Sequence, residues 1–324
     1  MNRSLCIAPM LDWTDKHFRY FLRLISTECM LYTEMIHYNA ILCGDPKRFL
    51  DYNVEENPIT LQLGGNDPHK LSQCVKIAEE YGYNEVNLNV GCPSDRVQSG
   101  AFGLCMMKNP SLVADCISNM KSNTKIPISI KCRIGYDHND SYQELYDFIS
   151  TITEANVDFV CIHARKGWLN GLSPKENRTI PKINYDFVYQ IKRDFPNQKI
   201  GINGNIETTD EALKHLKYVD ATMIGRAAYN NPYILADVDS RIYNKTSSNS
   251  KKKTRFEIIE ELLPYIDNEL TKGANLKHIT RHILGLFQGV PGARLFRRHL
   301  SENATKKGAN TQTLLEALNY IENN

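Results

Sequence analysis

Eight short runs of apolar and β-branched residues recur through the first 230 positions of the chain. They cover residues 5–10, 30–35, 59–64, 85–90, 128–132, 159–163, 199–203 and 221–224. Most are nearly continuous rather than alternating, which is typical of strands buried on both faces. Residues 70–81 and 111–121, between such runs, show helical periodicity. The alternation predicts a (β/α)8 TIM barrel over residues 1–240. A doubly wound open sheet is the alternative, although no G-x-G-x-x-G follows the first run.

The C-terminal part of the chain has a different pattern. Residues 241–255 are polar and basic, which predicts a linker. Residues 256–270 then place Ile259, Leu262, Leu263, Ile266 and Leu270 on one helical face. Further helices are predicted over 276–287, 293–300 and 311–321. We therefore expect a small all-helical domain over residues 256–324.

Composition limits the class of protein. The 324 residues are 42% hydrophobic and 23% charged, as in an ordinary globular protein. No apolar run approaches a membrane span, and the apolar stretch in the first residues is too short for a secretory signal. The nine cysteines include no C-x-x-C pair, which argues against a disulfide framework or a cysteine-built zinc site. We expect a reducing, cytoplasmic location and find no indication of an obligate protein partner.

Charge is unevenly distributed along the chain. Residues 241–324 hold 14 Lys and Arg against 8 Asp and Glu, a balance of +6, whereas the preceding 240 residues hold 25 against 29, a balance of −4. A basic C-terminal segment on a mildly acidic body indicates an anionic macromolecular partner, although a basic solvated face is also common.

Polar groups stand at nearly every predicted strand end. In a (β/α)8 barrel these ends build the active site. The set consists of Pro9 and Met10, Gln62, Asn89 and Cys92, Lys131 and Arg133, His163 and Arg165, Asn203 and Gly204, and Gly225 and Arg226. A packed barrel core has no need of such a series, because Lys, Arg and Gln are rarely buried without partners.

The chemistry of these strand ends favours a phosphorylated, electron-accepting ligand. Gly204, Gly225 and Arg226 follow the seventh and eighth strands, the usual phosphate site of this barrel. Lys131 suits a flavin, because reduced flavin carries negative charge that a fixed cation stabilises. His163 and Arg165 suit the ring edge or the phosphate. These groups are poor metal ligands, and His278 and His282, four apart with no third ligand nearby, are expected to be surface or interhelical histidines.

Cys92 follows an apolar run and lies in Gly91-Cys92-Pro93, a segment typical of a loop. A loop cysteine just beyond a strand end is placed to meet a ligand. Taken alone, it is better interpreted as a small buried hydrophobe, as most free cysteines are. The polar strand ends around it favour the functional interpretation.

Several long motifs together resemble the tRNA-dihydrouridine synthases. They are Ala8-Pro9-Met10, Gln62-Leu63-Gly64-Gly65, residues 87–94 (NLNVGCPS), Lys131-Cys132-Arg133, His163-Ala164-Arg165, Asn203-Gly204-Asn205 and Gly225-Arg226. Residues 163–178 and 289–298 are similar to subfamily A in particular. The resemblance covers nearly the whole chain in order, and it departs at none of these positions.

The resemblance implies an FMN enzyme that reduces the C5–C6 double bond of D-loop uridines in tRNA, at positions 20 and 20a. NADPH, or else NADH, would reduce the flavin. Cys92 would be the general acid that protonates C5, and an ordinary thiol is mostly protonated at neutral pH. Asn89 and Arg178 would hold the uracil edge. The flavin set it implies is Pro9, Met10, Gln62, Lys131, His163, Asn203, Gly204, Gly225 and Arg226.

The tRNA must also be held while the target base leaves its stack, which costs a few kcal/mol. Candidate contacts are Arg165, Lys166, Lys175, Arg294, Arg297, Arg298 and the lysines at 251–253. Two other functions remain open at this point. A barrel acting on a free pyrimidine, such as a dihydroorotate dehydrogenase, would have no need of the basic helical segment. A tRNA-binding or folding factor without catalysis would have no need of Cys92 and Lys131.

Overall fold

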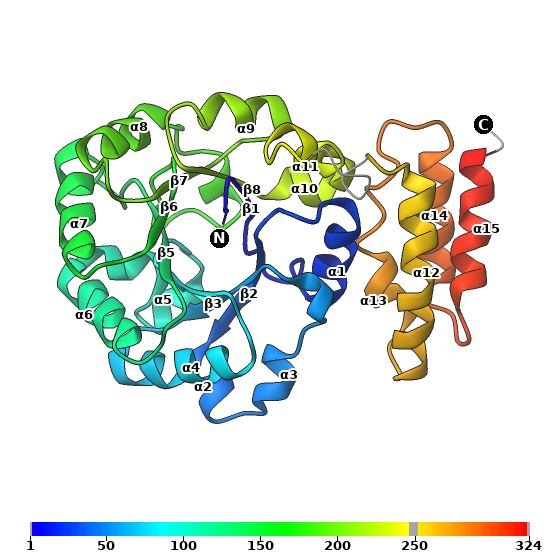
Figure 1. Ribbon diagram of the computed structural model, residues 1–324, viewed down its shortest axis with the longest axis horizontal. Coiled ribbons are helices and arrows are strands. Elements are labelled where there is room, and N and C mark those ends of the chain that lie inside the picture. The colour runs from blue at the N-terminus through cyan, green and yellow to red at the C-terminus, as the bar shows by residue number, and fades with distance from the viewer. Residues whose placement is uncertain (1, 246–251, 323–324) are drawn as a thin grey trace.

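The structure is a computed structural model that describes residues 2–245 and 252–322. Eight parallel strands form one sheet, in the order β1-β8-β7-β6-β5-β4-β3-β2 (Figure 1). Their bounds are β1 Leu5–Ile7, β2 Leu31–His37, β3 Ile59–Gly64, β4 Glu85–Asn89, β5 Ile128–Arg133, β6 Phe159–His163, β7 Ile200–Asn203 and β8 Ala221–Ile224. Hydrogen bonds from Ile7 N to Met30 O (2.8 Å) and from Met30 N to Leu5 O (2.9 Å) join β1 to the segment before β2. The barrel is confirmed, and the open sheet is excluded.

Helices surround the strands and continue into the C-terminal segment. They are α1 Lys16–Ile25, α2 Tyr38–Leu42, α3 Pro46–Leu50, α4 Pro68–Glu80, α5 Asp95–Ser99, α6 Pro110–Lys121, α7 Tyr142–Glu154, α8 Tyr185–Asp194, α9 Thr209–His215, α10 Arg226–Asn230, α11 Val238–Arg241, α12 Arg255–Thr271, α13 Leu276–Thr280, α14 Ala293–Asn303 and α15 Thr311–Glu322. Short 3-10 helices add Val54–Glu56, Gly103–Lys108, Glu176–Arg178 and Pro232–Leu235. None of the helices in the described ranges is long and apolar enough to cross a membrane.

The barrel interior is divided into an apolar side and a polar side. An apolar cluster from the strands β1, β6 and β8 and the start of β2 contains Cys6, Ala8, Met30, Tyr32, Phe159, Cys161, Ala221 and Met223. The strands β3, β4 and β5 instead turn buried polar side chains inward, at Gln62, Asn87 and Ser129 among others. Because side chains alternate along a strand, the intervening apolar residues pack outward against the helices. This division leaves room for hydrogen-bonded groups directly below the barrel mouth.

The C-terminal helices pack against α1 on one side of the barrel (Figure 1). Tyr265 of α12 stacks on Tyr20 with ring centroids 3.9 Å apart, and its hydroxyl lies 2.6 Å from His17 Nδ1. Glu269 of α12 pairs with Lys16 at 2.7 Å. The predicted face of this helix is therefore incomplete, because Tyr265 and Glu269 are buried at the barrel.

The helix predicted over 276–287 is wrong in length, since α13 ends at Thr280 and hydrogen-bonded turns follow as far as residue 290. Of the predicted linker, residues 246–251 lie outside the described residues. The domain boundaries as a whole stay a prediction.

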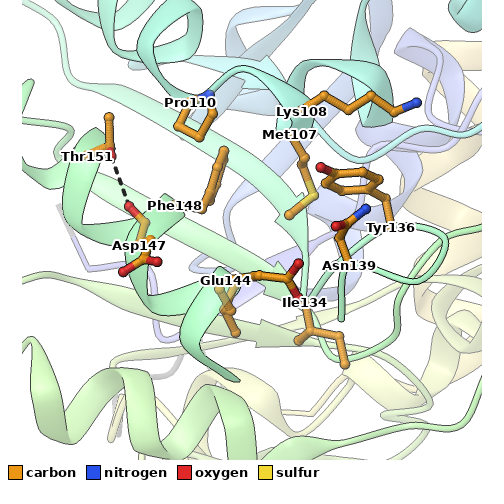
Figure 2. Close-up of a pocket in the computed structure, with 12 residues that line it drawn as sticks. Met107, Lys108, Pro110, Ile134, Tyr136, Asn139, Glu144, Asp147, Phe148 and Thr151 are labelled. Atoms are coloured by element: carbon orange, nitrogen blue, oxygen red, sulfur yellow. Dashed lines mark hydrogen bonds between the residues drawn. The ribbon is translucent and has the colours of Figure 1, made fainter. Parts of the chain in front are cut away.

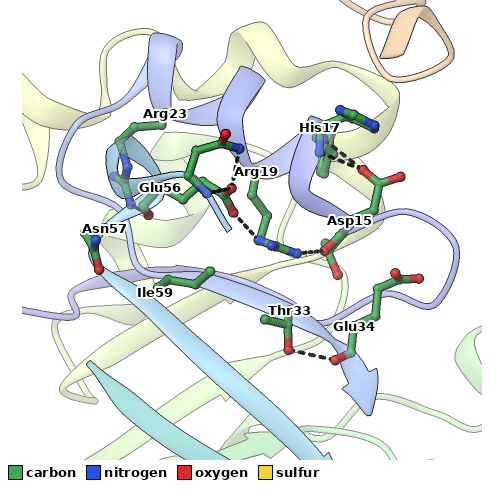
Figure 3. Close-up of polar contacts among 12 residues, drawn as sticks. Asp15, His17, Arg19, Arg23, Thr33, Glu34, Glu56, Asn57 and Ile59 are labelled. Atoms are coloured by element: carbon green, nitrogen blue, oxygen red, sulfur yellow. Dashed lines mark hydrogen bonds and ion pairs between the residues drawn. The ribbon is translucent and has the colours of Figure 1, made fainter. Parts of the chain in front are cut away.

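Helix α1 is itself anchored by buried charges (Figure 3). Arg19 Nε donates to Glu56 Oε2 at 2.6 Å, and both side chains are almost fully buried. Arg23 donates to the backbone oxygens of Glu56 and Pro58 at 3.0 and 3.1 Å. These bonds hold α1, and with it the loop from β1, in a single position on the barrel.

Candidate active site

The Gly91-Cys92 turn leaves the end of β4 and is held by side chains from two strands. Asn89 Oδ1 accepts hydrogen bonds from the backbone N–H groups of Gly91 (3.1 Å) and Cys92 (3.0 Å). Arg133 Nε, from the end of β5, donates to Gly91 O at 2.9 Å. The Cys92 thiol remains partly exposed and lies 3.4 Å from Ser94 Oγ. The functional interpretation of Cys92 is favoured, because its backbone is braced while its sulfur stays accessible.

Arg133 joins two loops of the barrel mouth, a structural role that the sequence did not indicate. Its Nη1 donates to Lys166 O at 3.0 Å and to Asn177 O at 3.1 Å, so one buried guanidinium ties the Cys92 turn to the long loop after β6. Asn177 is fully buried and organises that loop by bonding both backbone groups of Trp168. Burial lowers the pKa of Arg133 to about 10. The sequence placed Arg133 at a strand end and in the Lys131-Cys132-Arg133 motif, but it did not indicate these backbone contacts.

Five cationic side chains come from the C-terminal ends of the strands and the loops that follow them: Lys131, Arg133, Arg165, Arg178 and Arg226. No carboxylate in residues 2–245 and 252–322 forms a hydrogen bond or ion pair with any of them. Burial is the main cause that lowers the pKa of Lys131, Arg165 and Arg178. The Nε atom of Arg165 is buried and has no hydrogen-bond partner. Uncompensated cations in this number define an anion site.

His163 lies at the end of β6, among these cations. Burial lowers the pKa of His163 well below its usual range, and the charges of Arg133 and Lys131 lower it further. The imidazole is therefore neutral at neutral pH and can give one N–H and accept one hydrogen bond. This arrangement suits a ring edge better than it suits a phosphate.

The loops after β7 and β8 come close to His163. Gly204 has φ +124°, and a Cβ there would lie 2.9 Å from His163 Cδ2, so only glycine fits. Tyr185 donates to Gly204 O at 2.7 Å, and Asn203 Nδ2 donates to Met223 O at 2.7 Å. Arg226 reaches Arg178 O at 3.3 Å. A Cβ added at Gly225 would lie 3.6 Å from Ala8 Cβ and 3.9 Å from Met10 Sδ, its nearest neighbours. Met10 thus stands beside the same opening, and Pro9 lies between it and Ala8 in the chain.

The predicted tRNA contacts outside the mouth come from separate segments of the chain. Arg294, Arg297 and Arg298 lie on α14, and Arg298 is paired with Glu302 at 2.8 Å. Lys166 pairs with Asp140 at 2.6 Å, and Lys253 with Glu261 at 2.6 Å. Lys252 lies over the Tyr233 ring, Lys175 is exposed, and Lys251 is outside the described residues. Arg297 and Arg294 are the cations on α14 that remain open to a partner.

A cavity of about 210 Å³ lies between α6, α7 and the loop that follows β5 (Figure 2). Met107, Ile134 and Phe148 form its apolar wall, and Lys108, Glu144 and Asp147 stand at its edge. Glu144 already caps α7 through Ser141. The cavity contains none of the residues of the barrel mouth, so the chemistry is assigned to the mouth.

The predicted histidine pair is separated by the structure. His278 is exposed, whereas His282 is buried with its Nε2 3.0 Å from Asp15 Oδ2, across the contact between the barrel and the C-terminal helices. One is a surface residue and the other an interhelical residue, as expected. Within the described ranges, no three His, Cys, Asp or Glu side chains gather in a way that could hold a metal ion.

An eight-stranded barrel whose mouth joins an accessible thiol to a cationic anion site defines an enzyme of the (β/α)8 class. The family described as Dihydrouridine synthase (Dus) matches residues 6–322. The tRNA-dihydrouridine(20/20a) synthase of Vibrio parahaemolyticus is 54% identical over 318 residues, or 98% of this chain and 96% of that protein. The protein of the same name from Escherichia coli K12 is 53% identical over 97% of this chain and 90% of its own length. The chain therefore belongs to the dihydrouridine synthase family, which confirms the resemblance seen in the motifs.

Solved structures support the fold. The old yellow enzyme homologue from Zymomonas mobilis superposes with a TM-score of 0.53 at 13% identity, over 78% of this chain and 93% of that one. A 2-naphthoyl-CoA reductase complex gives 0.55 at 11% identity, over 72% of this chain and 49% of that one. At such low identities the likeness concerns the barrel alone.

Proposed function

We propose that this protein reduces the C5–C6 double bond of uridines 20 and 20a in tRNA to give 5,6-dihydrouridine, with FMN as cofactor and NADPH as reductant. Family membership supports the reaction class, and the names of the relatives support the positions. The observation that carries the proposal is the group of cations near the strand ends that have no carboxylate partner among the described residues, one of which, Arg133, holds the Cys92 turn. NADH remains the alternative reductant.

The residues at the mouth fit FMN. Gly204 allows close approach of a ligand, and Arg226 can balance a phosphate. Lys131 is partly buried, and among the described residues no hydrogen bond or ion pair engages its Nζ. It would balance negative charge on the ring, and Gln62 and His163 would donate hydrogen bonds to it. Pro9, Met10, Asn203 and Gly225 would complete the enclosure.

The proton is assigned to Cys92. When bound, the reduced flavin supplies the hydride that goes to C6 of the uracil. The Cys92 thiol gives its proton to C5, so the double bond gains one hydride and one proton. The thiolate then takes a proton from water. The N–H of Asn89 that Gln62 leaves unused, together with Arg178, would donate to the uracil carbonyl oxygens. Arg178 lies within electrostatic range of Cys92, which supports a shared ligand.

The tRNA would be held by its phosphates while the target base is extruded. Arg165 lies at the mouth, and Arg294, Arg297 and Arg298 lie on α14. A cytoplasmic location and the lack of an obligate protein partner stay predictions from the sequence.

The test is an anaerobic reoxidation experiment. Flavin in the purified protein is reduced with NADPH, and tRNA lacking modifications or orotate is then added. We expect rapid reoxidation by tRNA alone, with dihydrouridine at positions 20 and 20a. Reoxidation by orotate alone would move the protein to free-pyrimidine chemistry, and a protein that binds no flavin would refute the assignment of the mouth.

A further inference from the structure

A continuous line of side-chain hydrogen bonds runs through the barrel from the Cys92 turn to the opposite end. Asn89 Nδ2 donates to Gln62 Oε1 at 2.9 Å, and Gln62 Nε2 donates to Asn87 Oδ1 at 2.8 Å. Asn87 Nδ2 donates to Ser129 Oγ at 2.8 Å, and the Ser129 hydroxyl donates to Glu85. These five residues are called the interior polar chain. Glu85, Asn87, Ser129 and Gln62 are 0–1% exposed, so water does not compete for these bonds.

The two ends of the interior polar chain impose the same direction on it. At the lower end, the Glu85 carboxylate is paired with Arg3 and accepts hydrogen bonds, so Ser129 must donate. At the upper end, the backbone N–H groups of Gly91 and Cys92 can only donate, so Asn89 must turn its oxygen toward them. Each of the three amides between these ends is left with one orientation. In water, rotation of the side chain would freely interchange the positions of the amide oxygen and nitrogen.

We propose that Glu85, acting through Ser129 and Asn87, is a positioning residue that determines which atoms Gln62 and Asn89 present at the barrel mouth. The interior polar chain and the Cys92 turn use the amide oxygen and one N–H of Gln62 and of Asn89. The second N–H of each of these two side chains is therefore left for a ligand. The mouth therefore offers donors to carbonyl oxygens. That these carbonyls belong to a flavin and a uracil rests on the proposed function.

The interior polar chain also reaches the segment that carries the Cys92 thiol. Because Asn89 holds the Cys92 backbone, loss of its orientation would also loosen the turn. A buried hydroxyl removed from the middle of the chain leaves Asn87 Nδ2 without an acceptor, and a rotated Asn87 would leave Gln62 facing an amide nitrogen. The effect of Ser129 should therefore reach Cys92 through four hydrogen bonds and no direct contact.

The barrel provides a matched control. Thr60 lies two positions before Gln62 on β3, is fully buried, and has a hydroxyl with no hydrogen-bond partner. Thr60 is the ladder neighbour of Glu85 but makes no hydrogen bond to it. Thr60→Val thus removes a buried hydroxyl beside the interior polar chain without removing any of its hydrogen bonds. Ser129→Ala removes a hydroxyl that belongs to it. Ser129→Cys keeps a weak hydrogen-bond donor of similar size and is the second variant of the chain.

The first readout needs neither flavin nor tRNA. Flavin-free protein is treated with iodoacetamide, and the alkylation rate of Cys92 is divided by that of the exposed Cys43 by peptide mass spectrometry. We expect this ratio to rise about threefold or more in Ser129→Ala, to rise less in Ser129→Cys, and to stay unchanged in Thr60→Val. The second readout is FMN affinity, which should fall about tenfold in Ser129→Ala alone.

Two results would overturn the proposal. One is a folded Ser129→Ala protein with an unchanged Cys92 to Cys43 ratio and unchanged FMN affinity. The other is an equal change in Thr60→Val, which would show a general packing effect. If the alkylation ratio changes as expected but no flavin binds to the wild-type protein, the positioning holds and the proposed function fails.

Discussion

Asp15 and Arg281, 266 positions apart in the sequence, are joined by a hydrogen bond of 2.6 Å between carboxylate and guanidinium. The other oxygen of Asp15 caps α1 by accepting from the N–H groups of His17 and Phe18, each at 3.0 Å. Burial opposes the charged carboxylate, but the bonds from His282, Phe18 and Arg281 hold the pKa of Asp15 well below its usual range. One carboxylate thus fixes both the start of α1 and the placement of the C-terminal helices.

We predict that Asp15→Ser separates these two roles. Serine keeps the helix cap but cannot reach Arg281. The apparent KM for tRNA should rise about three- to tenfold, through the loss of a charge-assisted bond, while NADPH-dependent flavin reduction is unchanged. Asp67→Ser is the matched control, because Asp67 caps α4 in the same way and lies on a helix remote from the C-terminal segment. An equal rise in KM in the control would remove the argument.

We predict that the free energy of unfolding depends on pH through His17. Burial lowers the pKa of His17 to about 4, even though Asp15 raises it. Between about pH 6.5 and 4 the unfolded chain therefore binds a proton that the folded chain does not, and stability falls as the pH falls. The shift corresponds to at most about 3 kcal/mol. Chemical unfolding at pH 4.5 and 7 should show this difference, and His17→Asn should reduce it. Asp15 acts only below about pH 4, because its pKa is lowered from the ordinary carboxyl value.

Lys131 is predicted to be unfavourable for stability and favourable for function. Burial lowers the pKa of Lys131, and no carboxylate of the described residues compensates its charge. Lys131→Met should raise the melting temperature of flavin-free protein by about 2–4 °C. Reduction of bound flavin by NADPH should slow at least about tenfold. Lys192→Met, which removes a lysine paired with Asp220 at 2.8 Å, should instead lower the melting temperature. Lower stability in both variants would contradict the argument.

Cys92→Ala should bind flavin and oxidise NADPH normally but form no dihydrouridine, because only the proton donor is lost. The measurement is anaerobic, single-turnover reoxidation of reduced protein by tRNA. Cys105→Ala is the control, since residue 105 follows Leu104, whose N–H donates to Cys92 O at 2.9 Å. Dihydrouridine formed by Cys92→Ala at the wild-type rate would assign the proton to another group.

Arg297 on α14 is predicted to contact a tRNA phosphate. In a plot of log affinity against log salt concentration, Arg297→Ala should reduce the slope by about 0.7–0.9. Arg298→Ala should have a smaller effect, because Glu302 already engages that guanidinium. Lys217→Ala removes the same charge from the loop that enters β8, at the end of the barrel opposite the mouth, and should leave the slope unchanged. Equal slopes in all variants would place the tRNA elsewhere.

Predictable features of this protein depend on residues near one another in sequence. The strand and helix alternation predicted the barrel because apolar runs bounded by turn residues have few other solutions. The strand-end residues, from Gln62 to Arg226, follow from the same argument, since parallel strands bring their ends to one face. Their roles stay proposals. A closer application of alternation would also have found Glu85, Asn87 and Asn89 on one face of β4, and Ser129 on the same side of β5.

Only the tertiary structure decided which groups meet. The direction of the interior polar chain depends on Arg3 lying beside Glu85, and the α1 contact depends on Arg281 reaching Asp15. The helix predicted over 276–287 was too long. Local periodicity does not reveal that His282 turns inward to the barrel, where it meets Asp15. The spacing of apolar residues specifies helices and strands locally. Which polar side chains become partners is decided by the closure of the barrel and by the packing of the C-terminal helices against it.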